Sequence, residues 1–117
     1  EQQARKQAEA VGQNPDVAVK VGRFRYAGVG KAQATGDTTG FFKVIAESSG
    51  SKILGVHIVG AHAADLVHEA AMAMQGGATV TEMAGMNHAH PSLAEGLMEA
   101  AEDVEEKAIH QARKRVP

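Results

Sequence analysis

The sequence predicts an α+β fold in which a small antiparallel sheet packs against helices on one side. Two observations support this class. Apolar residues alternate with a period of two through much of residues 17–59, whereas after Gly60 they recur every three or four residues. The short connection at residues 48–51 (Ser-Ser-Gly-Ser) joins two apolar segments and is typical of a hairpin.

The N-terminal part predicts one helix and one strand. Residues 1–11 carry their apolar side chains on one face, and Gly12 closes the helix. Residues 14–16 (Asn-Pro-Asp) predict a turn. Residues 17–26 alternate in the manner of a strand, with one change of phase.

Two more strands and their links follow. Residues 28–37 are rich in Gly and Thr and predict a loop. Residues 41–46 and 53–59 predict the second and third strands, joined as an antiparallel hairpin.

The remainder predicts three helices. The apolar spacing of residues 63–74 indicates the first, which a pair of glycines ends. A short helix follows, with Thr79 or Thr81 as its cap. The last begins after Pro91 and runs to about residue 112, with acids first and a basic end that suits the helix dipole.

Composition bounds the class of protein. The 117 residues fit one domain, 44% are hydrophobic and only 3% are aromatic, so the core is built from small side chains. A net charge of −2 does not favour nucleic acid or a membrane surface. The absence of cysteine excludes a disulfide or a thiol nucleophile on this chain and fits a cytoplasmic location. Because Glu1 already lies in a helical pattern, we expect a fragment of a longer protein.

Three patterns that could indicate ligand sites are better explained as ordinary structural features of the fold. Residues 28–31 (Gly-Val-Gly-Lys) lack the first glycine of a phosphate loop, and Ala32 replaces its Ser or Thr. The six histidines show no HExxH spacing, so we expect no metal site. The five methionines recur at helical spacings that favour core or interface over an adaptable binding surface.

The strongest candidate for chemistry is residues 87–101, NHAHPSLAEGLMEAA. Ser92 and Glu95 have the spacing of a capping box, which by itself explains both. Pro91 keeps His90 extended and out of the helix, within reach of the Glu95 carboxylate. That carboxylate would select the ring tautomer, and the helix N-terminus would favour the neutral ring. Helix capping and general acid–base catalysis both remain open from the residues alone.

The same stretch carries a resemblance. HAHPSLAEGLMEAA resembles the C-terminal signature of dihydrolipoamide dehydrogenases, in the pyridine nucleotide–disulfide oxidoreductase family. KVGRFRYAGVGKAQATGDTTGFFKVIAE and ILGVHIVGAHAADLVHEAAMAMQGGATVTEMA resemble the preceding strands and helices, so the resemblance covers about residues 1–101. It implies a dimerisation (interface) domain that follows FAD- and NAD-binding domains. The enzyme would reoxidise dihydrolipoamide through a cysteine pair, then FAD, then NAD.

The resemblance also implies the roles of individual residues. His90 is implied to be the acid/base residue that serves the flavin and disulfide of the partner subunit in a homodimer, and Glu95 to orient its ring. The main chain at His90 and Pro91 would lie near the partner's FAD. A 2-oxo acid dehydrogenase complex is a further implied partner. The apolar residues expected to build the core and the dimer contact are Leu66, Ala70, Met74, Leu93 and Leu97.

The chain departs from the complete enzyme. It has no cysteine pair and no GxGxxG fingerprint, so we expect this fragment to bind neither FAD nor NAD and to be inactive alone. Residues 102–117 are expected to form a charged helical extension. Two alternatives stay open: a stand-alone homodimeric interaction module without redox activity, and the same domain of another disulfide reductase, such as a mercuric reductase.

Overall fold

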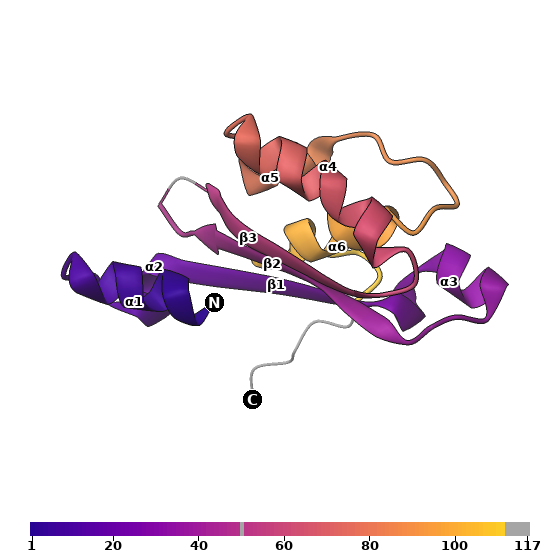
Figure 1. Ribbon diagram of the computed structural model, residues 1–117, viewed down its shortest axis with the longest axis horizontal. Helices are drawn as coiled ribbons and strands as arrows, with labels where there is room; N and C mark the ends of the chain where they lie inside the picture. Colours follow the sequence, from indigo (N-terminus) through magenta and orange to yellow (C-terminus); the bar gives the residue numbers. More distant parts are fainter. Residues whose placement is uncertain (50, 112–117) are drawn as a thin grey trace.

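The computed structural model describes residues 1–49 and 51–111. Its centre is a three-stranded sheet of order β1-β2-β3, formed by Val19–Arg25, Gly40–Glu47 and Ile53–Gly60 (Figure 1). Both neighbouring pairs are antiparallel. The α+β class and the expected hairpin are therefore confirmed.

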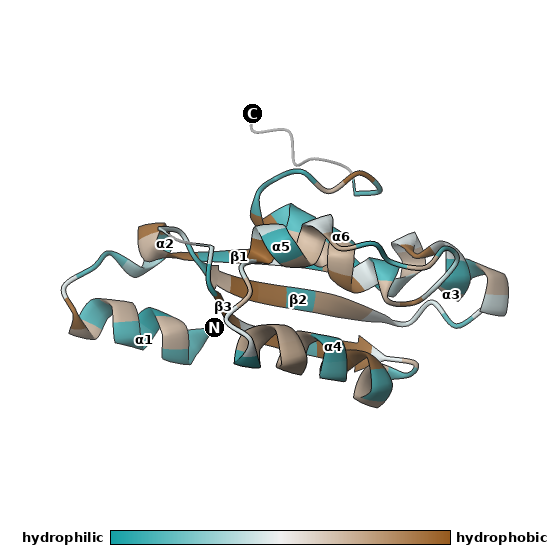
Figure 2. Ribbon diagram, turned by 90° about the horizontal axis from the view of Figure 1, so that it is seen from above, coloured by the Kyte–Doolittle hydropathy of each residue, from teal (hydrophilic) through white to brown (hydrophobic). Residues whose placement is uncertain are grey.

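The helices surround this sheet unevenly. They are α1 (Gln2–Ala10), α2 (Pro15–Ala18), η1, a 3₁₀ turn (Tyr26–Gly28), α3 (Gly30–Thr35), α4 (Ala63–Gln75), α5 (Val80–Gly85) and α6 (Glu95–Val104). Figure 1 shows α4, α5 and α6 together above the sheet, as the sequence predicts. Figure 2 shows β2 mostly in the colours of apolar residues.

The main core lies between the sheet and α6. Phe42 and Val44 of β2 pack there with Leu97 and Ala100 of α6, and all four are completely buried. The ring of Tyr26 stacks on that of Phe42, with centroids 4.6 Å apart. Small residues on α6 let the helix lie directly on the strands, which compensates for the few aromatic side chains.

α1 covers part of the opposite face of the sheet. Ala8 of α1 packs with Val19 and Ile45 in a second apolar cluster. Ile45 lies between Val44 and Ala46, which both face the main core, so its side chain points the other way. The helices therefore lie on both faces, rather than on one as the sequence analysis expected.

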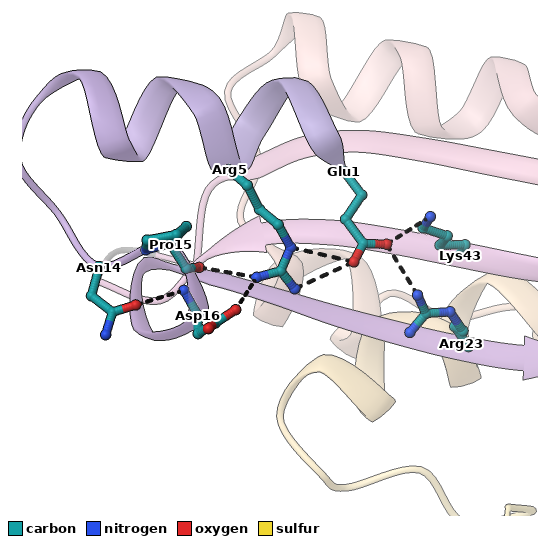
Figure 3. Close-up of polar contacts among 7 residues, drawn as sticks. All are labelled: Glu1, Arg5, Asn14, Pro15, Asp16, Arg23 and Lys43. Carbon is teal, nitrogen blue, oxygen red and sulfur yellow. Dashed lines mark hydrogen bonds and ion pairs between the residues drawn. The ribbon is translucent and has the colours of Figure 1, made fainter.

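Polar contacts hold α1 against this face. The Glu1 carboxylate contacts Lys43 Nζ at 2.8 Å, Arg23 at 3.0 Å and Arg5 at 3.3 Å (Figure 3). Arg5 also contacts Asp16 of α2 at 2.7 Å. The hydrogen bond from Lys43, helped by the two arginines and opposed by burial, lowers the pKa of Glu1 from 4.5 to about 2.

We expect Glu1→Gln to lower the free energy of unfolding by about 1 kcal/mol at pH 7, as for a partly exposed ion-pair network. The folded pKa lies below the unfolded one, so the stabilisation is complete above pH 4.5 and is lost as the pH falls towards 2. Urea unfolding of both chains at several pH values measures the difference. Glu9→Gln, at an exposed position of the same helix, is the control and should have no such effect. A constant difference from pH 7 to pH 2 would contradict this assignment.

Two predicted connections are helical. Residues 30–35 form α3 because Lys31, Ala32 and Gln33 favour helix, and Gly36 ends it at φ +76. The predicted loop over 28–37 was therefore wrong. The Asn14 side chain accepts a hydrogen bond from Asp16 N–H and caps α2, with Pro15 in its first turn. The first strand accordingly begins at Val19 instead of Val17.

The last helix is shorter than predicted. α6 ends at Val104 instead of about residue 112, because Glu106 adopts a left-handed conformation with φ +61. Lys107 N–H then donates to the Glu102 carbonyl at 2.9 Å and Glu106 N–H to the Asp103 carbonyl at 3.1 Å, which is a Schellman motif. The expected helical extension is therefore wrong for residues 105–111, and residues 112–117 lie outside the described residues.

Candidate functional site

His90 and Glu95 meet at the start of α6. His90 Nδ1 lies 2.8 Å from Glu95 Oε1, and the second carboxylate oxygen accepts from Ser92 N–H at 2.9 Å. One carboxylate therefore joins the histidine to the main chain before the helix. The His90 side chain is 78% exposed and that of Glu95 is 21% exposed. The histidine is thus the solvent-exposed member of this pair, while the carboxylate is held by the fold.

Only half of the predicted capping box forms. Glu95 accepts from Ser92 N–H, but the Ser92 hydroxyl is buried and has no hydrogen-bond partner among the described residues. Ala94, instead of Ser92, is the N-cap of α6. The reason is the tight turn before the helix, in which Gly96 N–H donates to the Leu93 carbonyl at 3.1 Å. The Ser92 hydroxyl therefore does not cap α6.

The contact with Glu95 determines which ring nitrogen can act. A carboxylate is an acceptor, so the neutral ring carries its hydrogen on Nδ1 and leaves the Nε2 lone pair available. Partial burial acts to raise the pKa of Glu95, but the hydrogen bonds from Ser92 and His90 and the charge of His110 together outweigh it. The pKa of Glu95 lies below its usual value of 4.5, so the carboxylate is ionised at neutral pH.

Close packing of α6 holds Glu95 in place. A Cβ atom at Gly96 would lie 2.2 Å from the ring of Phe42, which means that the helix start rests directly on β2. Leu97, next in sequence, is fully buried. The Glu95 carboxylate therefore belongs to a rigid part of the molecule.

Two of the histidine–carboxylate contacts that the sequence analysis missed have a buried member. His88 Nε2 lies 2.6 Å from Glu69 Oε1 on α4, and the His88 side chain is only 3% exposed. The His110 ring contacts Glu99, whose buried carboxylate also accepts from the main-chain N–H groups of Ile109 and His110. The two members of each pair lie 19 and 11 positions apart in the sequence, so no local motif indicates either contact. The contact with Glu99 raises the pKa of His110.

The remaining candidates are distributed over the surface and core. Within residues 1–49 and 51–111, no three His, Asp or Glu side chains converge as a metal site. Met83 is buried, whereas Met72, Met74 and Met86 are exposed. Ala70 and Leu97 lie in the core, with Leu66 and Leu93 packed against it. No helix in the described part of the chain is long and apolar enough to cross a bilayer.

The described fold does not provide a nucleotide-binding unit. Dinucleotides bind at the ends of parallel strands linked by crossover helices. Both strand pairs of the described sheet are antiparallel, and residues 28–31 enter a 3₁₀ turn and α3. The described residues therefore lack the parallel-strand unit at which dinucleotides bind in this way.

Known proteins similar to this chain agree on one family. The model of the pyridine nucleotide-disulphide oxidoreductase dimerisation domain matches residues 2–101. The dihydrolipoyl dehydrogenase of Thermus scotoductus is 44% identical over 92 residues, covering 79% of this chain and 20% of the relative. That of Bacillus subtilis is 40% identical over 104 residues, covering 89% of this chain and 21% of the relative. The chain thus spans about a fifth of the length of these curated relatives.

Solved structures show the same fold. LpdA from Mycobacterium tuberculosis matches with a TM-score of 0.69 and 26% identity, over 83% of this chain and 20% of that one. The HOCl-induced flavoprotein disulfide reductase RclA from Escherichia coli matches with a TM-score of 0.70 and 22% identity, over 82% of this chain and 21% of that one. The latter likeness concerns the fold alone.

Proposed function

Because this chain belongs to the pyridine nucleotide-disulphide oxidoreductase family, as a dimerisation domain of the dihydrolipoyl dehydrogenase-like kind, we propose that it supplies an acid/base pair to a dithiol oxidation site. His90 is the acid/base residue and Glu95 is the residue that orients it. The observation that carries the proposal is the 2.8 Å contact of Glu95 with His90 Nδ1, which leaves the other ring nitrogen, Nε2, free of this contact on a side chain that is 78% exposed.

The geometry suits proton transfer from a thiol. Nε2 accepts the proton of a substrate thiol, and the Glu95 carboxylate stabilises the imidazolium that forms. The thiolate left behind is the nucleophile that attacks one sulfur of the enzyme's cysteine pair, and the other sulfur leaves as a thiolate. Since this chain has no cysteine, that pair lies on another part of the enzyme.

The remaining parts of the proposal concern assembly. The domain forms a homodimer, and each His90 serves the disulfide of the partner subunit. Other domains of the complete subunit bind FAD and NAD, and the isolated fragment does not turn over substrate. The substrate is dihydrolipoamide, as the names of the curated relatives suggest, and the enzyme works in the cytoplasm, with a 2-oxo acid dehydrogenase complex as partner.

Glu95→Gln tests the pair. Glutamine can still accept from His90 Nδ1–H, but it carries no charge to stabilise the imidazolium. We expect the kcat of the complete enzyme to fall by about tenfold to a hundredfold, within the range that general acid–base catalysis contributes. Steady-state oxidation of dihydrolipoamide at several pH values measures the loss.

Glu82→Gln is the matched control. Glu82 also accepts a main-chain N–H at a helix start, in the capping box with Thr79, but this pair contains no histidine. Its replacement should leave turnover unchanged. Turnover of Glu95→Gln within twofold of the wild type would refute the role of Glu95.

A further inference from the structure

We propose that the buried pair His88–Glu69 positions the acid/base histidine, through the six residues 87–92 that we call the His90 segment. The inference extends the proposed function, because it concerns what holds His90 where Glu95 can orient it. His88 and Glu69 act through His90 and are positioning residues.

The His90 segment lacks the usual means of fixing a chain. Among the described residues, no hydrogen bond between main-chain groups involves residues 87–92. The segment is neither helix nor strand. Its position therefore depends on side-chain contacts, since main-chain polar groups outside regular structure are fixed only by other partners.

Two carboxylates hold the segment, one near each end. Glu69 of α4 contacts the His88 ring, and Glu95 of α6 contacts His90 and Ser92 N–H. α4 packs on β3, and α6 packs on β1 and β2. The residue after Glu69, Ala70, is 1% exposed, so α4 is anchored in the core at this point. The His90 segment is thus bonded to two helices, α4 and α6, which pack on different strands of the sheet.

The surroundings of the His88 ring show that its contact with Glu69 is a hydrogen bond. Nδ1 lies 2.9 Å from the Met86 carbonyl oxygen, which cannot donate, so Nδ1 carries a hydrogen. Nε2 lies 2.6 Å from Glu69 Oε1, so a proton lies between these two atoms. Either the ring is charged and donates, or the carboxylic acid is neutral and donates. In both cases the pair is bonded and neutral overall.

Burial of the His88 ring makes loss of its hydrogen bond to Glu69 costly. The His88 side chain is 3% exposed and that of Glu69 is 25% exposed. A buried ring nitrogen without its partner is costly, so removing Glu69 should release the segment instead of leaving it in place. Because misplacement of a reacting group by about 1 Å can cost on the order of a hundredfold in rate, a loosened segment would impair His90.

Glu69→Ala in the complete enzyme tests the inference. We expect kcat to fall about tenfold, because the His90 segment loses one of its two ties. Glu69→Gln should stay within about twofold, since its amide can donate to the neutral His88 ring and keep the bond. The control is Asp65→Ala on the same helix, which removes the exposed, 3.4 Å contact with His62 and should have no effect.

A double variant separates positioning from general damage. If Glu69 acts through His90, the pair Glu69→Ala with His90→Gln should be no slower than His90→Gln alone. The inference would be overturned if the losses in kcat of the two single variants multiplied in the double variant. It would also be overturned if Glu69→Ala had normal turnover while His90→Gln was impaired. Either result would leave the proposed function intact. If Glu69→Ala does not fold, His88→Asn serves instead, because asparagine is too short to reach Glu69.

A measurement on this chain is independent of turnover. Nitrogen-15 NMR of the histidine rings reports the tautomer, and contact with Glu95 selects the form with hydrogen on Nδ1 of His90. Glu69→Ala should shift His90 towards the Nε2–H form that free imidazole favours, whereas Glu69→Gln and Asp65→Ala should not. An unchanged His90 tautomer in Glu69→Ala would overturn the inference even if the proposed function also failed.

Discussion

Replacement of His90 by glutamine is expected to lower the turnover of dihydrolipoamide in the complete enzyme by about 10² or more, as for loss of a general acid–base. Glutamine matches the reach of the ring but has no group that accepts a proton near neutral pH. Nδ1 of His90 contacts Glu95, and the His90 side chain is exposed. Among the described residues, Glu95 contacts His90 and the main-chain N–H of Ser92, so this carboxylate holds no second base that could replace the ring. Stopped-flow reduction by the dithiol, together with steady-state kcat, measures the effect.

His57→Gln provides the matched control for this substitution. His57 lies on β3 opposite Lys43, exposed and on the other face of the sheet from the main core. The same chemical change there should leave kcat within twofold. Activity of His90→Gln within tenfold of the wild type would contradict the proposed function.

A mixed dimer tests which subunit His90 serves. One subunit carries His90→Gln, and the other retains His90 but has serines in place of the cysteine pair. If His90 acts across the dimer, one complete site forms and about half of the activity returns, although each parent homodimer is inactive. If His90 acts within its own subunit, the mixed dimer contains no complete site and stays inactive.

Gly22→Ala is expected to destabilise the fold strongly. A Cβ atom there would lie 2.1 Å from the Ala100 carbonyl oxygen and 2.5 Å from the Val104 nitrogen. Both are main-chain atoms of α6, so no side-chain rotation can relieve the clash. The helix must lift from β1, and we expect a loss of about 3 kcal/mol, at the upper end for overpacking. Urea unfolding followed by circular dichroism measures it.

The control for this substitution is Gly85→Ala. Nothing lies within 4 Å of a Cβ atom at Gly85, the last residue of α5, and its φ is not in the left-handed region. Alanine should therefore leave stability unchanged or raise it by up to about 1 kcal/mol through helix propensity. A loss below 1 kcal/mol in Gly22→Ala would show that α6 does not rest on β1 as closely as described.

The structure confirms the sequence predictions that rest on short-range patterns. The hairpin of β2 and β3 and helices α4 and α5 occur where periodicity and end signals indicate them. The meeting of His90 with Glu95 was also predictable, because a separation of five positions, across a proline and into a first helical turn, allows few other arrangements. The roles of the two residues in catalysis remain predictions.

The sequence predictions were wrong where a local pattern was compatible with two different structures. Glycine and threonine near residues 28–37 suggested a loop, although the residues between them favour the helix α3. Ser92 had the spacing of a cap, yet the chain makes a tight turn first and the helix begins at Glu95. A continuous charged pattern after Val104 suggested more helix, but the left-handed residue Glu106, which a sequence pattern rarely indicates, ends it.

The sequence by itself determined the fold class and the acid/base candidate, because periodicity and the six-residue motif at 90–95 are local properties of the chain. Only the tertiary structure decided that α1 lies on the second face of the sheet and that Glu69 meets His88 across 19 residues. Both depend on how the helices pack against the strands. That packing follows from the fit of many small side chains, such as Ala8 and Ala70, which resemble one another in the sequence and differ only in their place in the fold.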